Sequence, residues 1–135
     1  MHFFCLGYVT SVKNQGSCGS CAAFAAHGMH EATLVKAGAS STNLDLSEQH
    51  LLDCAYGESG ANGCNGATMQ VYQNWFVNDG GLSPSETDYA YEGTSSDMVC
   101  DSSIEKYDPG YKMSSMDYTY SCDEETMKSV SEISF

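Results

Sequence analysis

Apolar residues are densest in the stretch that starts at Cys21, and this pattern predicts a buried helix. Residues 21–26 read Cys-Ala-Ala-Phe-Ala-Ala, and apolar positions recur up to Gly38, where the pattern stops. A helix that is apolar on every side in its first turns belongs in the core of a protein. Ser20 is of a residue type that caps helix N-termini, so we expect Cys21 in the first turn.

A second helix is predicted to begin at Ser47 and to end near Cys54. Ser47 is again a residue type that caps helix N-termini. Leu46, just before this cap, and Leu51, inside the helix, have the spacing of a hydrophobic staple. Residues 57–63, which are rich in glycine, predict a loop with several turns.

A third helix is predicted over residues 67–78, ended by a pair of glycines. The apolar side chains of one face recur at helical spacing: Met69, Tyr72 and Phe76. Residues 107–120 are rich in tyrosine and alternate in polarity, which predicts one or two strands. Ser121 and Glu124 have the spacing of a capping box and predict a last helix.

The composition of the chain argues against nucleic acid and membranes as partners. The 135 residues are enough for one domain with its own core. Eighteen acidic side chains against five lysines give a formal charge of −13, so nothing here forms a basic surface for nucleic acid. No apolar run approaches the length that crosses a bilayer, so we expect no membrane partner. We expect the acidic residues to form a solvated surface.

Seven cysteines are heavy usage for a chain of this length. In a secreted protein such a number indicates disulfides, and because the number is odd, at least one thiol is unpaired within the chain. Cys21 is the cysteine best placed for chemistry. The first turn of a helix directs backbone N–H groups and the positive end of the helix dipole at a side chain there, and both stabilise a thiolate nucleophile.

Gln15 lies six residues before Cys21, across a turn that contains glycine. Its side-chain amide can lie beside the sulfur in that arrangement. Together with the backbone N–H of Cys21 it would form an oxyanion hole with two donors for an acyl intermediate.

The segment from Gln15 to Cys21, Gln-Gly-Ser-Cys-Gly-Ser-Cys, resembles the active-site signature of the papain family of cysteine proteases, in particular the cathepsin L-like members. Further blocks of the family pattern follow in order at family spacing: Leu46-Ser47-Glu48-Gln49, Asp53-Cys54, Gly63-Cys64-Asn65-Gly66, Gly80-Gly81-Leu82 and Tyr89-Ala90-Tyr91-Glu92-Gly93. The likeness covers residue 7 to about residue 100.

The resemblance implies an α+β fold of the papain type. Residues 1–135 are then a partial peptidase domain: about 7–100 form the helical left domain with the central active-site helix, and about 101–135 begin the crossover to the right, barrel-like domain. That right domain is largely missing from the chain. In the family it supplies the catalytic histidine and the asparagine that orients it.

The resemblance also implies roles for single residues. Cys21 is the nucleophile and Gln15 the side chain of the oxyanion hole, with bridges that join Cys18 to Cys64 and Cys54 to Cys100. The residues implied to border the bound peptide are Gly19, Asn65, Gly66, Ala67, Thr68 and Met69. Two positions depart from the family pattern: Ala22 replaces a tryptophan that would otherwise fill the core, and Ala67 replaces a glycine.

The resemblance further implies peptide or protein substrates, with a propeptide or cystatin-like inhibitors as further partners, and no cofactor. It implies a lysosomal, vacuolar or extracellular location. No histidine in the chain is expected to serve Cys21. His27 and His30 lie about 240° and 180° around the helix and about 9 and 13 Å along it. We expect these two and His50 to be ordinary, partly buried or surface residues.

Some of these residues also fit the patterns of other functions. Cys18-Gly19-Ser20-Cys21 is also a dithiol redox pattern, but no strand–helix–strand unit surrounds it. Zinc binding by Cys18, Cys21, Cys54 and Cys64 would have irregular ligand spacing, so we expect no metal. Cys5 and Cys122 have no assigned partner, and their pairing stays open. A non-catalytic homologue that binds peptides or inhibitors is the alternative to a protease.

Overall fold

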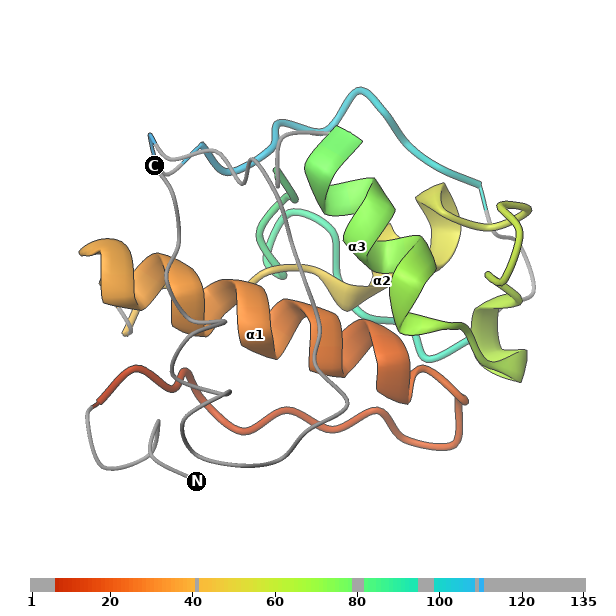
Figure 1. Ribbon diagram of the computed structural model, residues 1–135, viewed down its shortest axis with the longest axis horizontal. Helices are drawn as coiled ribbons and strands as arrows, with labels where there is room; N and C mark the ends of the chain where they lie inside the picture. Colours follow the sequence, from red (N-terminus) through yellow and green to blue (C-terminus); the bar gives the residue numbers. More distant parts are fainter. Residues whose placement is uncertain (1–6, 41, 79–81, 95–98, 109, 111–135) are drawn as a thin grey trace.

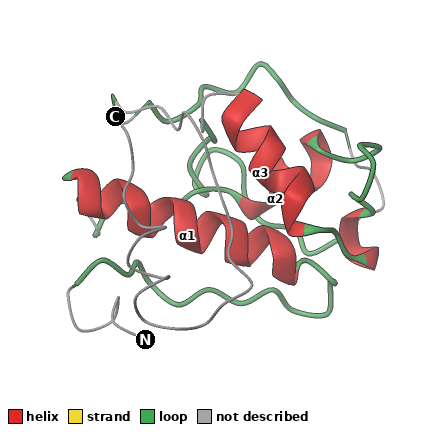
Figure 2. Cartoon of the chain, viewed as in Figure 1, coloured by secondary structure: helices red, strands yellow, loops and turns green. Residues whose placement is uncertain are grey.

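The structure, a computed structural model, describes residues 7–40, 42–78, 82–94, 99–108 and 110. The regular elements of this part are three α-helices and a short 3₁₀ helix: α1 (Cys21–Ala37), α2 (Glu48–Cys54), η2 (Gly63–Asn65) and α3 (Met69–Asn78). No strand occurs among the described residues (Figure 2); their β-pairing consists of isolated bridges. Most of the predicted strand region and the last helix lie outside them.

Helix α1 is the longest element, and the other helices pack against it. Both α2 and α3 contact α1 (Figure 1). The chain before α1, from residue 7 to residue 20 (the extended segment), has no helical structure and runs back along α1 on its other side. Cys21, the first residue of α1, directly follows the turn that delivers the chain into the helix.

The main core lies where α1 meets α2 and α3. Ala23 of α1, Leu51 of α2 and Phe76 of α3 are completely buried there. Small alanines on α1 bring the helices close together, and the larger side chains of α2 and α3 fill the space. Tyr72 and Phe76 are buried on the predicted face of α3, while Met69 is half-buried against the same core.

Helix α1 begins and ends where the sequence predicts, but the side chain of its N-cap residue does not cap it. Ser20 is the N-cap residue, yet its side chain makes no capping hydrogen bond. Its hydroxyl lies 2.7 Å from the hydroxyl of Tyr91 instead, so the predicted N-cap position is confirmed but the serine side chain makes a tertiary contact in place of a capping bond. At the other end Gly38 has a φ of 116°, a left-handed conformation that suits glycine, and its N–H turns back to the last carbonyls.

Helix α2 is capped as predicted, but the hydrophobic staple is not formed. The Ser47 hydroxyl accepts a hydrogen bond from the N–H of His50 at 3.1 Å. Leu51 packs in the main core, whereas Leu46 packs with Leu34 and Leu44 in a separate cluster. The staple fails because the chain before α2 turns toward the far end of α1.

Helix α3 begins two residues later than predicted, at Met69. The residues before it are held by the loop instead. Ala67 pairs with Ala61 in an isolated bridge, and the Thr68 N–H donates to the Gly60 carbonyl at 2.9 Å. Backbone groups used in this way are not available for a further helical turn.

Two disulfides join these elements. The first connects Cys18, just before α1, to Cys64 in η2. The second connects Cys54, the last residue of α2, to Cys100. Both pairings are those implied by the family resemblance. They indicate a protein that folds along an oxidising route, such as the secretory pathway.

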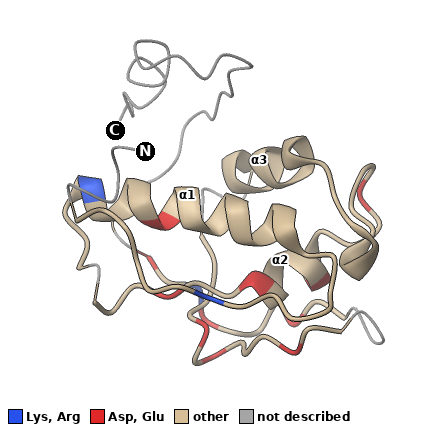
Figure 3. Ribbon diagram, turned by 90° about the horizontal axis from the view of Figure 1, so that it is seen from below, with Lys and Arg blue, Asp and Glu red and all other residues tan. Residues whose placement is uncertain are grey.

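The acidic residues are not all solvated, which corrects the prediction. Figure 3 shows acidic positions on the helices as well as on the loops. Glu31 of α1 and Glu48 of α2 are each only 1% exposed. The ammonium group of Lys13 lies 3.1 Å from Glu31 and 2.9 Å from Glu48, and 2.7 Å from the more exposed Asp45. The extended segment thus supplies the positive charge that makes two buried carboxylates tolerable.

Among the described helices, none has both the length and the apolar character needed to cross a lipid bilayer.

Candidate active site

Cys21 is the first residue of α1, and its side chain is exposed. Within the described part of the chain it is the free cysteine. The thiol therefore sits where the unpaired N–H groups of a helix point, in contact with solvent and with any ligand. Tyr72 of α3 lies within its electrostatic reach: burial, and then the negative charge of Cys21, raise the pKa of Tyr72 to about 12.

Gln15 is held in the turn that leads to Cys21. One N–H of its side-chain amide donates to the Cys18 carbonyl at 2.9 Å. An amide nitrogen carries two hydrogens, so the second remains as a donor. The turn itself is stabilised by the Asn14 side chain, which accepts a hydrogen bond from the Gly16 N–H at 2.9 Å.

Tyr91 connects this turn to the start of α1. Its hydroxyl donates to the Gln15 backbone carbonyl at 2.9 Å and lies 2.7 Å from the Ser20 hydroxyl. Its ring packs edge-on against Phe24 with a centroid separation of 5.0 Å. Tyr91 is thus a positioning residue for both Gln15 and the first turn of α1. We did not assign it a role from the sequence, although it lies in one of the blocks of the family pattern.

Gly19 allows the turn before Cys21 to pack closely against η2. Its N–H donates to the Cys64 carbonyl at 2.9 Å, beside the Cys18–Cys64 bridge. A side chain at Gly19 would place its first carbon 2.4 Å from that carbonyl oxygen, which is too close for any residue but glycine. The absence of a side chain is what allows this close approach.

The residues expected to border a peptide follow directly in the chain. Asn65 and Thr68 are exposed, while Gly66, Ala67 and Met69 are half-buried. The segment is held by the bond from the Asn62 N–H to the Gly66 carbonyl at 3.0 Å. A side chain at Gly66 would meet no other atom within 4 Å, so the space beside it is open. The structure therefore brings η2 and the start of α3 to the same end of α1 as Cys21.

None of the described histidines lies in the solvent-exposed environment of Cys21, and the expected partial exposure was wrong. His27, His30 and His50 are exposed by only 0%, 3% and 2%. His27 and His30 pack against Phe76, and the Nε2 of His27 lies 3.0 Å from the Ser83 hydroxyl. The aromatic rings of α3 complete a core that encloses these imidazoles, which the pattern of α1 alone does not reveal.

Burial controls the charge of these histidines. It lowers the pKa of His30 to about 4. Burial and the neighbouring positive groups, His30 foremost, lower the pKa of His27 well below its usual range. Both imidazoles are therefore neutral core groups near pH 7. Burial raises the pKa of Glu48 to about 7, although Lys13 opposes this change.

Comparison with known proteins identifies what this arrangement resembles. The sequence profile of the family described as papain family cysteine protease matches residues 5–134. Rat (Rattus norvegicus) procathepsin L is 46% identical over 87 residues, which cover 64% of this chain and 25% of that protein. Cysteine proteinase 6 of Dictyostelium discoideum is 38% identical over 103 residues, which cover 76% of this chain and 22% of that protein. The chain thus spans about a quarter of the length of these curated relatives.

Solved structures share the fold. The Carica candamarcensis cysteine protease CMS1MS2, in complex with E-64, superposes with a TM-score of 0.61 and 30% identity. The match covers 84% of this chain and 48% of that protein. Bromelain protease from Ananas comosus, in complex with the E64 inhibitor, gives a TM-score of 0.63 and 32% identity, over 78% of this chain and 46% of that one.

The family profile covers nearly the whole chain, and the Cys21 helix, the two bridges and the helical arrangement agree with it. By homology the family is one of peptide hydrolases that act through a cysteine. The chain belongs to the papain family of cysteine proteases.

Proposed function

We propose that this chain carries the nucleophilic half of a cysteine endopeptidase, with Cys21 as the nucleophile. The observation that supports this most directly is the free, exposed thiol at the first residue of α1, beside the Gln15 turn. A thiol in this position is both activated by the helix end and open to a substrate carbonyl. Residues 7–100 as the left domain and 101–135 as the crossover are part of the same proposal.

The proposed reaction is acyl transfer in two steps. The Cys21 thiolate attacks the scissile carbonyl carbon, and the free N–H of Gln15 together with the Cys21 backbone N–H stabilises the oxyanion. The intermediate collapses to a thioester and releases an amine, which takes a proton from a histidine outside this chain. Water then attacks the thioester, forms the acid product and returns the thiol.

The substrate is proposed to be an extended peptide that lies along Gly19 and residues 65–69. Gly19 and Gly66 present backbone without a side chain, which suits pairing with a peptide main chain. Thr68 and Met69, where α3 begins, would then contact one substrate side chain. Propeptides or cystatin-like inhibitors are proposed partners of the same surface, and a lysosomal, vacuolar or extracellular location fits the disulfides.

Covalent labelling with E-64, the inhibitor bound to both solved relatives, tests the role of Cys21. The full chain is incubated with E-64, and the adduct is located by intact mass and peptide mapping. We expect one adduct on Cys21, none in Cys21→Ser, and slower labelling in Gln15→Ala. The proposal fails if iodoacetamide alkylates Cys21 but E-64 leaves it unmodified.

A non-catalytic homologue that binds peptides or inhibitors is the second candidate. The burial of all three described histidines supports it, because none of them is available to protonate a leaving amine at Cys21. A fluorogenic peptide assay separates the two candidates. Turnover that disappears in Cys21→Ser supports the protease, whereas saturable binding of a cystatin without turnover supports the second candidate.

A further inference from the structure

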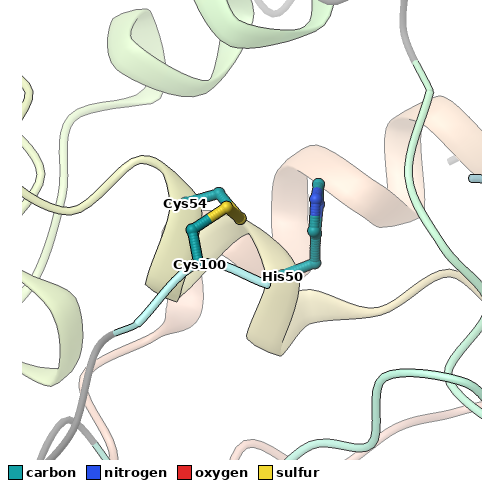
Figure 4. Close-up of side chains that lie close together, drawn as sticks. All are labelled: His50, Cys54 and Cys100. Atoms are coloured by element: carbon teal, nitrogen blue, oxygen red, sulfur yellow. A yellow bond between two sulfur atoms is a disulfide. The ribbon is translucent and has the colours of Figure 1, made fainter. Parts of the chain in front are cut away.

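A second cluster of reactive side chains lies away from Cys21, at the C-terminal end of α2. His50 and Cys54 are four residues apart on this helix, and Cys100 lies beside them although it follows Cys54 by 46 residues in the sequence (Figure 4). One imidazole nitrogen and the two sulfurs all lie within 4.8 Å of one another. In the structure the sulfurs are joined as a disulfide. The proposed protease chemistry does not use His50.

The two bridges differ in their access to solvent. Cys100 is exposed and Cys54 half-buried. In the other bridge Cys18 is only 4% exposed and Cys64 is half-buried. Thiol–disulfide exchange requires a thiolate to reach a sulfur, so a dithiol reductant attacks the exposed Cys100 sulfur first. A reductant that keeps Cys21 as a thiol therefore also acts on the Cys54–Cys100 bridge.

The opened bridge would leave a ligand set that suits a thiophilic cation. Zinc in a tetrahedral site binds thiolates at about 2.3 Å and imidazole at about 2.0 Å, so its ligand atoms lie roughly 3.5 Å apart. Bonded sulfurs lie about 2 Å apart, so the two sulfurs need to separate by less than about 2 Å to reach this spacing. We propose that His50, Cys54 and Cys100 form a zinc site when this disulfide is reduced.

The surrounding contacts hold the three ligands in place without the disulfide. The His50 ring packs edge-on against Trp75 and Tyr89, with centroids 6.1 and 5.6 Å away. The Tyr89 hydroxyl lies 2.8 Å from the Asp53 carboxylate and 3.2 Å from the Val99 carbonyl. The hydroxyl therefore links Asp53, the residue before Cys54, to Val99, the residue before Cys100.

A second tether joins α2 to the same part of the chain. The Gln49 side chain accepts from the Glu92 N–H at 3.1 Å and donates to the Thr94 carbonyl at 3.3 Å. The exposed carboxylate of Asp101, the residue directly after Cys100, adds negative charge beside the cluster, which favours a dication. Because Cys100 is exposed, a water molecule can complete a fourth ligand position.

Reduction of the disulfide and binding of zinc are two separate steps. A dithiol reduces the Cys54–Cys100 bond, becomes a disulfide itself and leaves two protein thiols. Zinc then binds both sulfurs and the neutral imidazole, and the two thiol protons are released to solvent. The disulfide bond and the zinc ion exclude each other, because both use the sulfurs of Cys54 and Cys100. Bound zinc should therefore block reoxidation of the bridge.

The test uses the full chain with its free thiols, Cys21 included, alkylated beforehand. Mild dithiol treatment should then free two thiols, which peptide mapping should assign to Cys54 and Cys100. Titration with Zn²⁺ against a chromophoric chelator should give one ion per chain. Cobalt substitution should show charge-transfer absorption of two thiolates, and His50→Asn should weaken zinc binding by about tenfold or more.

Controls separate this site from adventitious zinc. Cys100→Ser should abolish tight binding, and zinc should slow reoxidation in the parent but not in His50→Asn. Near-UV circular dichroism checks that each reduced chain is folded; if reduction unfolds the parent, stoichiometric Zn²⁺ should restore the signal. Unchanged affinity in His50→Asn, binding that survives Cys100→Ser, or no binding and no recovery of structure would each overturn the proposal.

Discussion

Tyr91 shows how a residue remote in sequence sets the geometry of the Cys21 site. Its hydroxyl contacts both the Gln15 carbonyl and the Ser20 hydroxyl, which flank the turn into α1. This contact joins Gln15, the proposed oxyanion donor, to the residue before Cys21, the proposed nucleophile. A small displacement of either group is enough to slow a reaction that depends on their alignment.

Tyr91→Phe should therefore slow E-64 labelling of Cys21 while leaving the fold intact. Loss of one hydroxyl with two partners should cost about 1–2 kcal/mol in the free energy of unfolding. Urea unfolding and the labelling rate measure the two effects separately. Tyr89→Phe is the matched control, because its hydroxyl faces Asp53 at the other end of α2, and its labelling rate should equal that of the parent. Equal rates in all three proteins would contradict a positioning role for Tyr91.

Gly19→Ala should destabilise the chain, because the added methyl group would lie 2.4 Å from the Cys64 carbonyl oxygen. Overpacking of this kind costs about 1–3 kcal/mol. Gly28→Ala provides the opposite case: the position is helical with nothing within 4 Å, and alanine should stabilise α1 by about 1 kcal/mol. Thermal unfolding of both variants measures the contrast. A Gly19→Ala protein as stable as the parent would show that η2 can move away.

At the scale of elements, helix α1 was predicted almost completely because its determinants are local. The apolar run after Ser20 and the glycine at position 38 mark both ends. Local signals also placed the Ser47 cap of α2. The predictions of the start of α3 and of the leucine staple were wrong, because the loop bond from Thr68 to Gly60 and the separate packing of Leu46 involve residues outside the helices themselves.

Lys13 fastens the extended segment to both α1 and α2. It pairs with Glu31 and Glu48, and Glu31 also accepts hydrogen bonds from the Thr10 hydroxyl and, at 2.8 Å, from the Leu46 N–H. Lys13→Met would leave two buried carboxylates without a counter-charge. Breaking a buried pair in this way costs about 3–5 kcal/mol, which urea unfolding at pH 7.5 should detect.

A second substitution tests whether the loss comes from the carboxylates. Adding Glu48→Gln to Lys13→Met removes one of the unpaired charges, so the double variant should be more stable than Lys13→Met alone. If the two substitutions are additive, with each one destabilising independently, the stabilising role assigned to the ion cluster is wrong.

For the whole molecule, buried titrating groups make stability depend on pH in two opposite directions. Unfolded His30 binds a proton below about 6.5, but the folded residue does so only below about 4, so stability falls as the pH drops between these values. Glu48 acts the other way: with a folded pKa of about 7 against 4.5 unfolded, its contribution is full below 4.5 and is lost as the pH rises through 7.

Between pH 6.5 and pH 4, the His30→Gln variant should therefore lose about 3 kcal/mol less in its free energy of unfolding than the parent does. Glu48→Gln should make that acid loss steeper, because the opposing group is gone. Free energies of unfolding at several pH values between 4 and 7.5 measure both slopes. Parallel pH profiles for the parent and His30→Gln would show that another group controls acid sensitivity.

The sequence by itself determined the family, the place of Cys21 at the start of a helix and the helices whose start and stop signals lie within a few residues. Those features depend on local chemistry: residue type, spacing and capping. The tertiary structure alone decided which polar groups are buried. The burial of Glu31 and Glu48, the packing of the histidines behind Phe76 and the approach of Cys100 to His50 each depend on segments far apart in the chain. Burial is a property of the assembled core, so no local pattern specifies it.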